Sequence, residues 1–188
     1  MKERFEGENR PRLIAALKRQ EFSLGKDEIA ETLAEKGELI EFDVGQHVIS
    51  QNATDNDLYF LVSGVVGIVV NGAQIATRTA GQHVGEMAAL EPSLPRSATV
   101  TALEKIVAVK ISSAQFMNFG QTHPEIWLPF AQELARRLYQ RNSTIALPNE
   151  APKLFIISST EARKIAHALR AGLESSPLSC RSSAFRIA

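Results

Sequence analysis

Two residues of opposite charge, Glu86 and Arg96, flank a short loop within residues 81–102, and Gly85 directly precedes the glutamate. Residues of these types can hold a cyclic ribose-phosphate. The Arg96 guanidinium can donate two charge-assisted hydrogen bonds to the phosphodiester oxygens. Glu86 can accept a hydrogen bond from the free 2′-hydroxyl, and Gly85 allows the backbone to approach closely. The spacing alone also allows a simple ion pair between Glu86 and Arg96, which would contribute little.

The residues around this pair resemble the phosphate-binding motif of cyclic nucleotide-binding domains. Residues 84–88 read VGEMA, and after a short loop residues 96–100 read RSATV. Earlier in the chain, LYFL at residues 58–61 followed by Gly64 is similar to a second motif of that family. The two motifs occur in the same order as in the family. The resemblance extends from about residue 39 to residue 145.

The resemblance implies a mainly β fold with flanking helices: an eight-stranded, jelly-roll-like β-barrel followed by a long dimerisation helix. In that fold Glu86 would bind the ribose and Arg96 the cyclic phosphate. The ligand-binding residues would be Gly85, Glu86, Met87, Ala88, Arg96, Ser97 and Ala98. Two positions depart from the family, because Asn52 stands where glycine is usual and Ala89 where a larger aliphatic residue is usual. By residue type alone, Met87 and Leu90 are expected to be core rather than contact residues.

An all-β core is indicated by the sequence between about residues 39 and 111. Short β-branched and aromatic runs, such as LYFLV, VVGIVV and KIVAVKI, are separated by glycines at close spacing. This pattern is typical of a sandwich or a barrel. Asn71-Gly72 lies between two apolar runs and predicts a tight hairpin.

Amphipathic helices are predicted on both sides of this core. Residues 11–21 and 26–36 carry apolar side chains at helical spacing and are expected to pack against the barrel. Ser112 or Ser113 is expected to cap a short helix that follows the last strand. Residues 125–145 form a longer helix, whose partner is either the barrel or a second copy of the same helix. Its apolar stripe consists of Trp127, Ala131, Leu134, Leu138 and Ile145.

The polar side of the helix at residues 125–145 has two interpretations. Arg137, Tyr139 and Gln140 can reach a nucleotide base from it, and Tyr and Arg can stack on a base. A solvated face is the favoured interpretation. Ligand binding is expected to order residues 81–102 and to draw this helix against the pocket, which would change how two protomers meet.

The composition excludes several other classes of protein. Lys plus Arg and Asp plus Glu both number 21, and this balance argues against DNA binding. One cysteine, Cys180, forms no internal disulfide, and the four histidines show no metal-ligand spacing. The sequence shows neither a signal peptide nor an apolar run of about 20 residues, so we expect no membrane contact and a cytoplasmic location.

The C-terminal segment resembles a different family. After a polar linker, residues 153–161 read KLFIISSTE and continue as ARKIAHAL, like the opening strand, serine-rich loop and first helix of a TIR-like domain. Ile157 and Ala162 depart from that pattern. A barrel joined to such a domain is similar to effectors of the Pycsar antiphage system. In that family a nucleotide cyclase makes cyclic UMP or cyclic CMP on infection, and the effector's TIR domain then destroys NAD.

The predicted organisation is therefore N-terminal helices at residues 1–38, a cyclic nucleotide-binding domain with its C-terminal helix at 39–147, and a linker with an incomplete TIR-like segment at 148–188. That last segment is too short for a whole TIR domain, so we expect no NAD hydrolysis by this chain alone and assign no catalytic residue. Truncation, a frameshift and a piece of a longer protein are the alternative explanations.

The sequence predicts a sensor of cyclic mononucleotides, with cyclic UMP or cyclic CMP as ligand and with no further cofactor and no metal. We expect a homodimer through residues 125–145 and a functional link to a nucleotide cyclase. One alternative is a cyclic AMP-responsive regulator of the catabolite-activator type without its DNA-binding domain. Another is a nucleotide hydrolase built on the C-terminal segment, for which Glu161 and Glu174 are the candidate acids.

Overall fold

The computed structural model describes residues 1–144 and 159–174. The predicted strand near residues 154–157 and Ile145 of the apolar stripe lie outside these ranges. The chain divides into two units, Met1–Thr144 and Ile145–Ala188. In the described part of the second unit, α6 (Arg163–Glu174) confirms the predicted helix. Among its apolar residues Ala166 is buried, whereas Ile165 and Leu169 are exposed.

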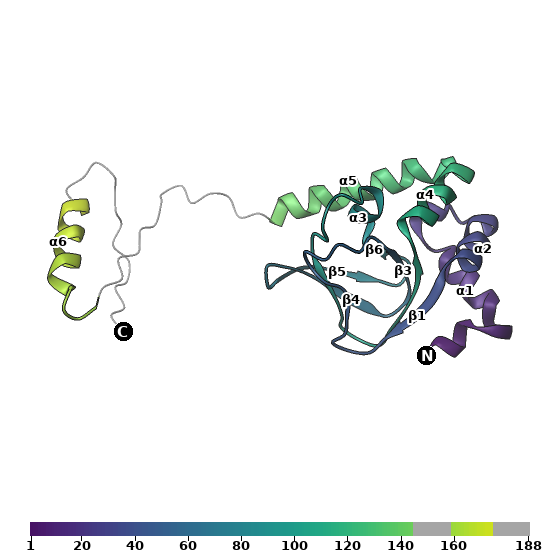
Figure 1. The fold of residues 1–188 in the computed structure, drawn as a ribbon, viewed down its shortest axis with the longest axis horizontal. Coiled ribbons are helices and arrows are strands. Elements are labelled where there is room, and N and C mark those ends of the chain that lie inside the picture. The colour runs from purple at the N-terminus through teal and green to yellow at the C-terminus, as the bar shows by residue number, and fades with distance from the viewer. Residues whose placement is uncertain (145–158, 175–188) are drawn as a thin grey trace. The chain divides into compact units, whose positions relative to one another are not determined.

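Eight strands in the first unit form two four-stranded antiparallel sheets (Figure 1). One sheet has the order β1-β8-β3-β6 and the other has the order β2-β7-β4-β5. Their bounds are β1 Glu38–Phe42, β2 His47–Ile49, β3 Leu58–Ser63, β4 Val65–Val70, β5 Ala73–Thr79, β6 His83–Val84, β7 Thr99–Ala102 and β8 Ile106–Ile111. The predicted jelly-roll-like arrangement of eight strands with flanking helices is confirmed.

Strand β3 explains why a continuous apolar run forms a strand here. Its side chains alternate between two faces. Leu58, Phe60 and Val62 pack into the core beneath the helices, whereas Tyr59 and Leu61 pack into the interior between the sheets. Because both faces are covered, both sets of positions are apolar.

The predicted hairpin joins β4 to β5. Asn71 and Gly72 adopt φ angles of 50° and 81°, and Val70 pairs with Ala73 across the turn. Positive φ at both central residues defines the two-residue turn that matches the twist of the strands. The prediction from Asn-Gly is confirmed.

Helices cover one face of the first sheet (Figure 1). Ser112 caps α4 through a capping box: its Oγ accepts from the Gln115 backbone N–H, and the Gln115 side chain accepts from the Ser112 backbone N–H. The helices are α1 Arg10–Leu17, α2 Asp27–Lys36, α3 Glu86–Leu90, α4 Ser113–Thr122 and α5 Trp127–Thr144. In these ranges and in α6, the structure contains no helix that is both long and apolar enough to span a membrane.

The first half of α5 is anchored by aromatic rings. Phe130 stacks on His83 with ring centroids 4.6 Å apart and also contacts Phe22 and Phe116. Trp127 lies edge-on to Phe116, and its indole N–H donates to the Gly120 carbonyl at 3.0 Å. This half of α5 therefore packs within the first unit, against α4, β6 and the segment around Phe22.

The second half of α5 exposes apolar surface. Leu138 is 59% exposed although it continues the stripe of Trp127 and Leu134. Tyr139 beside it is 77% exposed, and Leu128 in the first turn is 69% exposed. The barrel therefore covers only part of the apolar surface that this helix carries.

Candidate functional site

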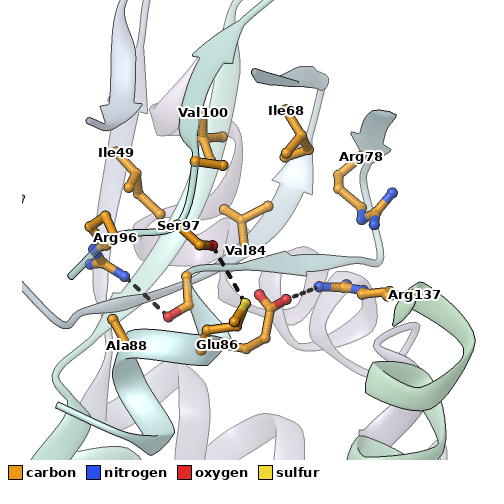
Figure 2. A pocket seen from close by; sticks show the side chains of 13 residues that line it. Ile49, Ile68, Arg78, Val84, Glu86, Ala88, Arg96, Ser97, Val100 and Arg137 are labelled. Atoms are coloured by element: carbon orange, nitrogen blue, oxygen red, sulfur yellow. Dashed lines mark hydrogen bonds and ion pairs between the residues drawn. The ribbon is translucent and has the colours of Figure 1, made fainter. Parts of the chain in front are cut away.

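A pocket opens beside α3, between the strands and α5 (Figure 2). It contains every residue that the sequence placed in the ligand site. The lining residues are Ile49, Ile68, Arg78, Val84, Gly85, Glu86, Met87, Ala88, Arg96, Ser97, Ala98, Val100 and Arg137. Apolar side chains from the strands form the walls, and the charged groups come from α3, α5, β5 and the loop before β7.

Gly85 is required at its position because of both conformation and space. Its φ is 93°, in the left-handed region that other residues rarely adopt. A Cβ there would lie 2.7 Å from the Asp57 carbonyl oxygen and 2.8 Å from Arg96 Nη1. Glycine thus allows the start of α3 to lie directly against the arginine.

Arg96 is 2% exposed and is held by four hydrogen bonds. Its Nε and Nη2 groups donate to Asp55 Oδ2, Nη1 donates to the Gly85 carbonyl at 3.1 Å, and Nη2 donates to the Asp57 carbonyl at 2.7 Å. Sequence reasoning missed Asp55 and Asp57, which precede the LYFL motif. They fix the guanidinium in a pocket wall, so it is positioned before any anion arrives.

Glu86 does not pair with Arg96. Its side chain is 14% exposed, and Oε1 lies 2.8 Å from Arg137 Nη1 (Figure 2). The alternative of a simple Glu86–Arg96 ion pair is therefore wrong, because each residue has a different partner. A carboxylate has two oxygens with two lone pairs each, so this contact leaves Glu86 able to accept another hydrogen bond.

Arg137 links the pocket to α5. Besides Glu86, its guanidinium contacts the Glu133 carboxylate and donates to the His83 carbonyl at 2.9 Å. Its side chain is only 12% exposed, so the solvated-face interpretation is wrong for Arg137. Tyr139 and Gln140 on the same helix are exposed. The sequence feature that could have predicted this pairing is the four-residue spacing of Glu133 and Arg137, which places both side chains on one helix face.

The structure also tests what the sequence predicted for Met87, Leu90 and Asn52. Met87 is 45% exposed at the pocket, so the expectation that it is a core residue is wrong. Leu90 packs against the core as expected. Asn52 has φ 66°, a conformation that asparagine tolerates better than most residues, and this explains how it replaces the family's glycine. Its backbone N–H donates to the Arg96 carbonyl at 2.8 Å.

Beneath the pocket lies a buried, uncharged histidine. Burial, and then the nearby Arg137 and Arg78, hold the pKa of His83 well below 6.5. His83 Nδ1 lies 3.5 Å from Glu133 Oε2, but with a neutral ring this contact is not an ion pair. Burial also raises the pKa of Glu133, which the Arg137 guanidinium partly opposes. His83 therefore contributes packing and its carbonyl, not charge.

We expect the protein to lose stability as the pH falls below about 6.5. There the unfolded chain takes up a proton on His83 that the native state excludes, so His83 destabilises the fold by up to about 1.4 kcal/mol per pH unit. Above 6.5 this effect is absent. The raised pKa of Glu133 acts in the opposite direction, because it favours the native state as the pH falls.

The measurement is urea unfolding at pH 7.5 and at pH 5.5 for wild type and His83→Phe. Phenylalanine keeps a ring against Phe130 but cannot take up a proton. The difference between the two proteins isolates the histidine from Glu133. An equal loss of stability in both proteins would contradict the prediction.

Within residues 1–144 and 159–174, no group of three or more His, Cys, Asp and Glu side chains is arranged to hold a metal ion. His47 and His167 are exposed, whereas His83 and His123 are buried among aromatic rings. The pocket itself brings together three arginines, one carboxylate and apolar walls.

Comparison with known proteins agrees with this geometry. Residues 39–123 match the family model of the cyclic nucleotide-binding domain. More particularly, the chain is similar to Pycsar effector proteins. BcPycTIR of Burkholderia cepacia is 43% identical over 171 residues, 90% of this chain and 56% of that protein. PaPycTIR of Pseudomonas aeruginosa is 39% identical over 173 residues, 92% of this chain and 56% of that protein.

The chain thus spans little more than half the length of these relatives. Solved structures show the same fold at lower identity. Cyclic AMP-bound PfPKA-R is 18% identical with a TM-score of 0.63, over 71% of this chain and 46% of that one. The Thermus thermophilus catabolite activator protein is 21% identical with a TM-score of 0.56, over 62% of this chain and 56% of that one.

Proposed function

We propose that this chain is the sensor part of a Pycsar-type antiphage effector, with cyclic UMP or cyclic CMP as its ligand. The observation that carries the proposal is the buried, pre-positioned Arg96 that shares one pocket with Glu86. The relatives named as Pycsar effectors support the defence role. In the full-length protein, ligand binding would activate a TIR-type domain that degrades NAD, and residues 148–188 would supply the linker and the opening segment of that domain.

In the proposed complex the cyclic phosphate lies against Arg96. Asp55 and two carbonyls use four of the five guanidinium N–H groups, which leaves one on Nη1 for a phosphate oxygen. The first backbone N–H groups of α3, near Met87 and Ala88, lack partners within the helix and add further donors. Ser97 and Ala98 line the same wall.

The ribose lies against Glu86, which accepts from the 2′-hydroxyl. Because Glu86 is paired with Arg137, the ribose contact and α5 act on one carboxylate. A ligand that changes this ion pair shifts the position of α5, and this links the pocket to the rest of the effector. The exposed Leu138 and Tyr139 of α5 support a homodimer through residues 125–145 as part of the same proposal. A functional link to a nucleotide cyclase and a cytoplasmic location are further parts of this proposal.

The test is isothermal titration of the purified chain with cyclic UMP, CMP, AMP and GMP, and with 2′-deoxy cyclic UMP. We expect the tightest binding for a pyrimidine ligand, and binding weaker by about tenfold without the 2′-hydroxyl that Glu86 would accept. A preference for cyclic AMP would favour the catabolite-activator alternative. Binding of none of these ligands would refute the sensor proposal.

A further inference from the structure

A third arginine in the pocket, besides Arg96 and Arg137, is not explained by ribose or phosphate binding. Arg78 on β5 is half-buried and lines the pocket, and its Nη1 donates to the adjacent Thr77 carbonyl at 2.8 Å. Within the described ranges no carboxylate forms an ion pair with it, in contrast to Arg96 and Arg137. A guanidinium has five donors and no acceptor, so most of the Arg78 donors are available to a ligand.

The position of Arg78 identifies the part of a ligand that it would meet. Figure 2 shows Arg96 at one end of the pocket, Arg78 and Arg137 at the other end, and Glu86 between them. If the cyclic phosphate lies at Arg96 and the 2′-hydroxyl at Glu86, the base extends towards Arg78. Ile68 lies on the same side and offers an apolar surface to the flat face of a base.

We propose that Arg78 is a specificity-determining residue that selects cyclic nucleotides whose base carries a carbonyl oxygen. The proposal deepens the proposed function and rests on it. Uracil, cytosine and guanine present carbonyl oxygens that accept from a guanidinium, whereas adenine presents an amino donor and ring nitrogens. Arg137 already bonds to Glu86, Glu133 and the His83 carbonyl. Arg78 is therefore the arginine free of carboxylate partners at this end of the described pocket.

The electrostatics of this end support the same assignment. Burial, and then the neighbouring Arg137, lower the pKa of Arg78 from its ordinary value, although the charges of Glu86 and Glu133 partly oppose this. An acceptor oxygen from a ligand would stabilise that charge in a site of reduced dielectric. An amino group from adenine would place a donor against donors and would be rejected.

The experiment compares wild type, Arg78→Ala and Arg78→Lys by isothermal titration with the four cyclic nucleotides. A fifth ligand, the 3′,5′-cyclic phosphate of methyl riboside, carries the ribose and phosphate but no base. We expect Arg78→Ala to weaken cyclic UMP binding by about 10- to 100-fold, as for loss of a hydrogen bond to a charged group. Binding of the base-free ligand should change less than about threefold, and binding of cyclic AMP should stay the same or become tighter, because the donor that opposes adenine is removed. Lysine, which lacks the planar fork, should restore only part of the loss.

Arg12→Ala, an exposed arginine on α1, is the matched control and should leave all five affinities unchanged. The inference is overturned if Arg78→Ala keeps the wild-type order of preference, if it weakens the base-free ligand equally, or if wild type prefers cyclic AMP. The first two outcomes leave the proposed function intact, whereas a preference for cyclic AMP would also favour the catabolite-activator alternative. Failure of wild type to bind any of the ligands overturns the sensor proposal itself.

Discussion

Replacing Arg96 by alanine is expected to weaken cyclic nucleotide binding by more than about 100-fold, because the buried partner of the phosphate is lost. The same change should destabilise the fold by about 1–3 kcal/mol. The carbonyls of Gly85 and Asp57 each lose a donor, although the Gly85 carbonyl keeps its hydrogen bond from the Ala89 backbone N–H at 3.2 Å. Asp55 is 45% exposed and regains water, so it adds little to the loss.

Isothermal titration measures the affinity, and urea unfolding measures the stability. Arg96→Lys keeps a positive charge but not the fork, so we expect intermediate binding. Arg136→Ala removes an exposed arginine that pairs with Glu21 on the surface, and both readouts should stay near wild type. A folded Arg96→Ala protein that binds within threefold of wild type would show that the phosphate lies elsewhere.

Replacing Phe130 by alanine is expected to cost about 3–5 kcal/mol of unfolding free energy, because a large buried ring is removed and a cavity remains. Phe130 is 1% exposed. Its ring centroid lies 4.6 Å from that of His83, 5.2 Å from Phe116 and 5.9 Å from Phe22. Removal of the Phe130 ring therefore weakens the contact between α5 and the strands. It also affects the pocket, because Phe130 packs on His83 and the His83 carbonyl accepts from Arg137.

Urea unfolding at pH 7.5 measures this effect. Tyr139→Ala is the matched control, since it removes an aromatic ring from the same helix at a position that is 77% exposed. Its unfolding free energy should stay within about 0.5 kcal/mol of wild type. If the two variants lose similar stability, the described packing of α5 against the strands is incorrect.

The strands and helices of this fold were predictable because local patterns specify them. Positive φ at Asn71 and Gly72 follows from residue type, and Ser112 caps α4 through a local bond to Gln115. The residues around Gly85 and Arg96 could likewise be assigned to the pocket from the sequence, since they lie close together in the chain and resemble a family motif.

The partners of the charged residues were not predictable, since the fold brings them together across long separations. Asp55 reaches Arg96 from another loop, and Arg137 reaches Glu86 from α5. Arg78 sits in an exposed edge strand, where an arginine is unremarkable by pattern. Met87 was misjudged because an apolar residue in a short helix is usually buried, whereas here the pocket exposes it.

Trp127 is the single tryptophan of the chain, and it lies at the first residue of α5 with its indole bonded to Gly120 and edge-on to Phe116. Ultraviolet emission excited at the red edge of the absorption band therefore comes from one place, the joint between α4 and α5. The protein carries its own optical reporter there. Displacement of α5 by a ligand would alter that emission without any label, and a stopped-flow instrument could follow it in real time.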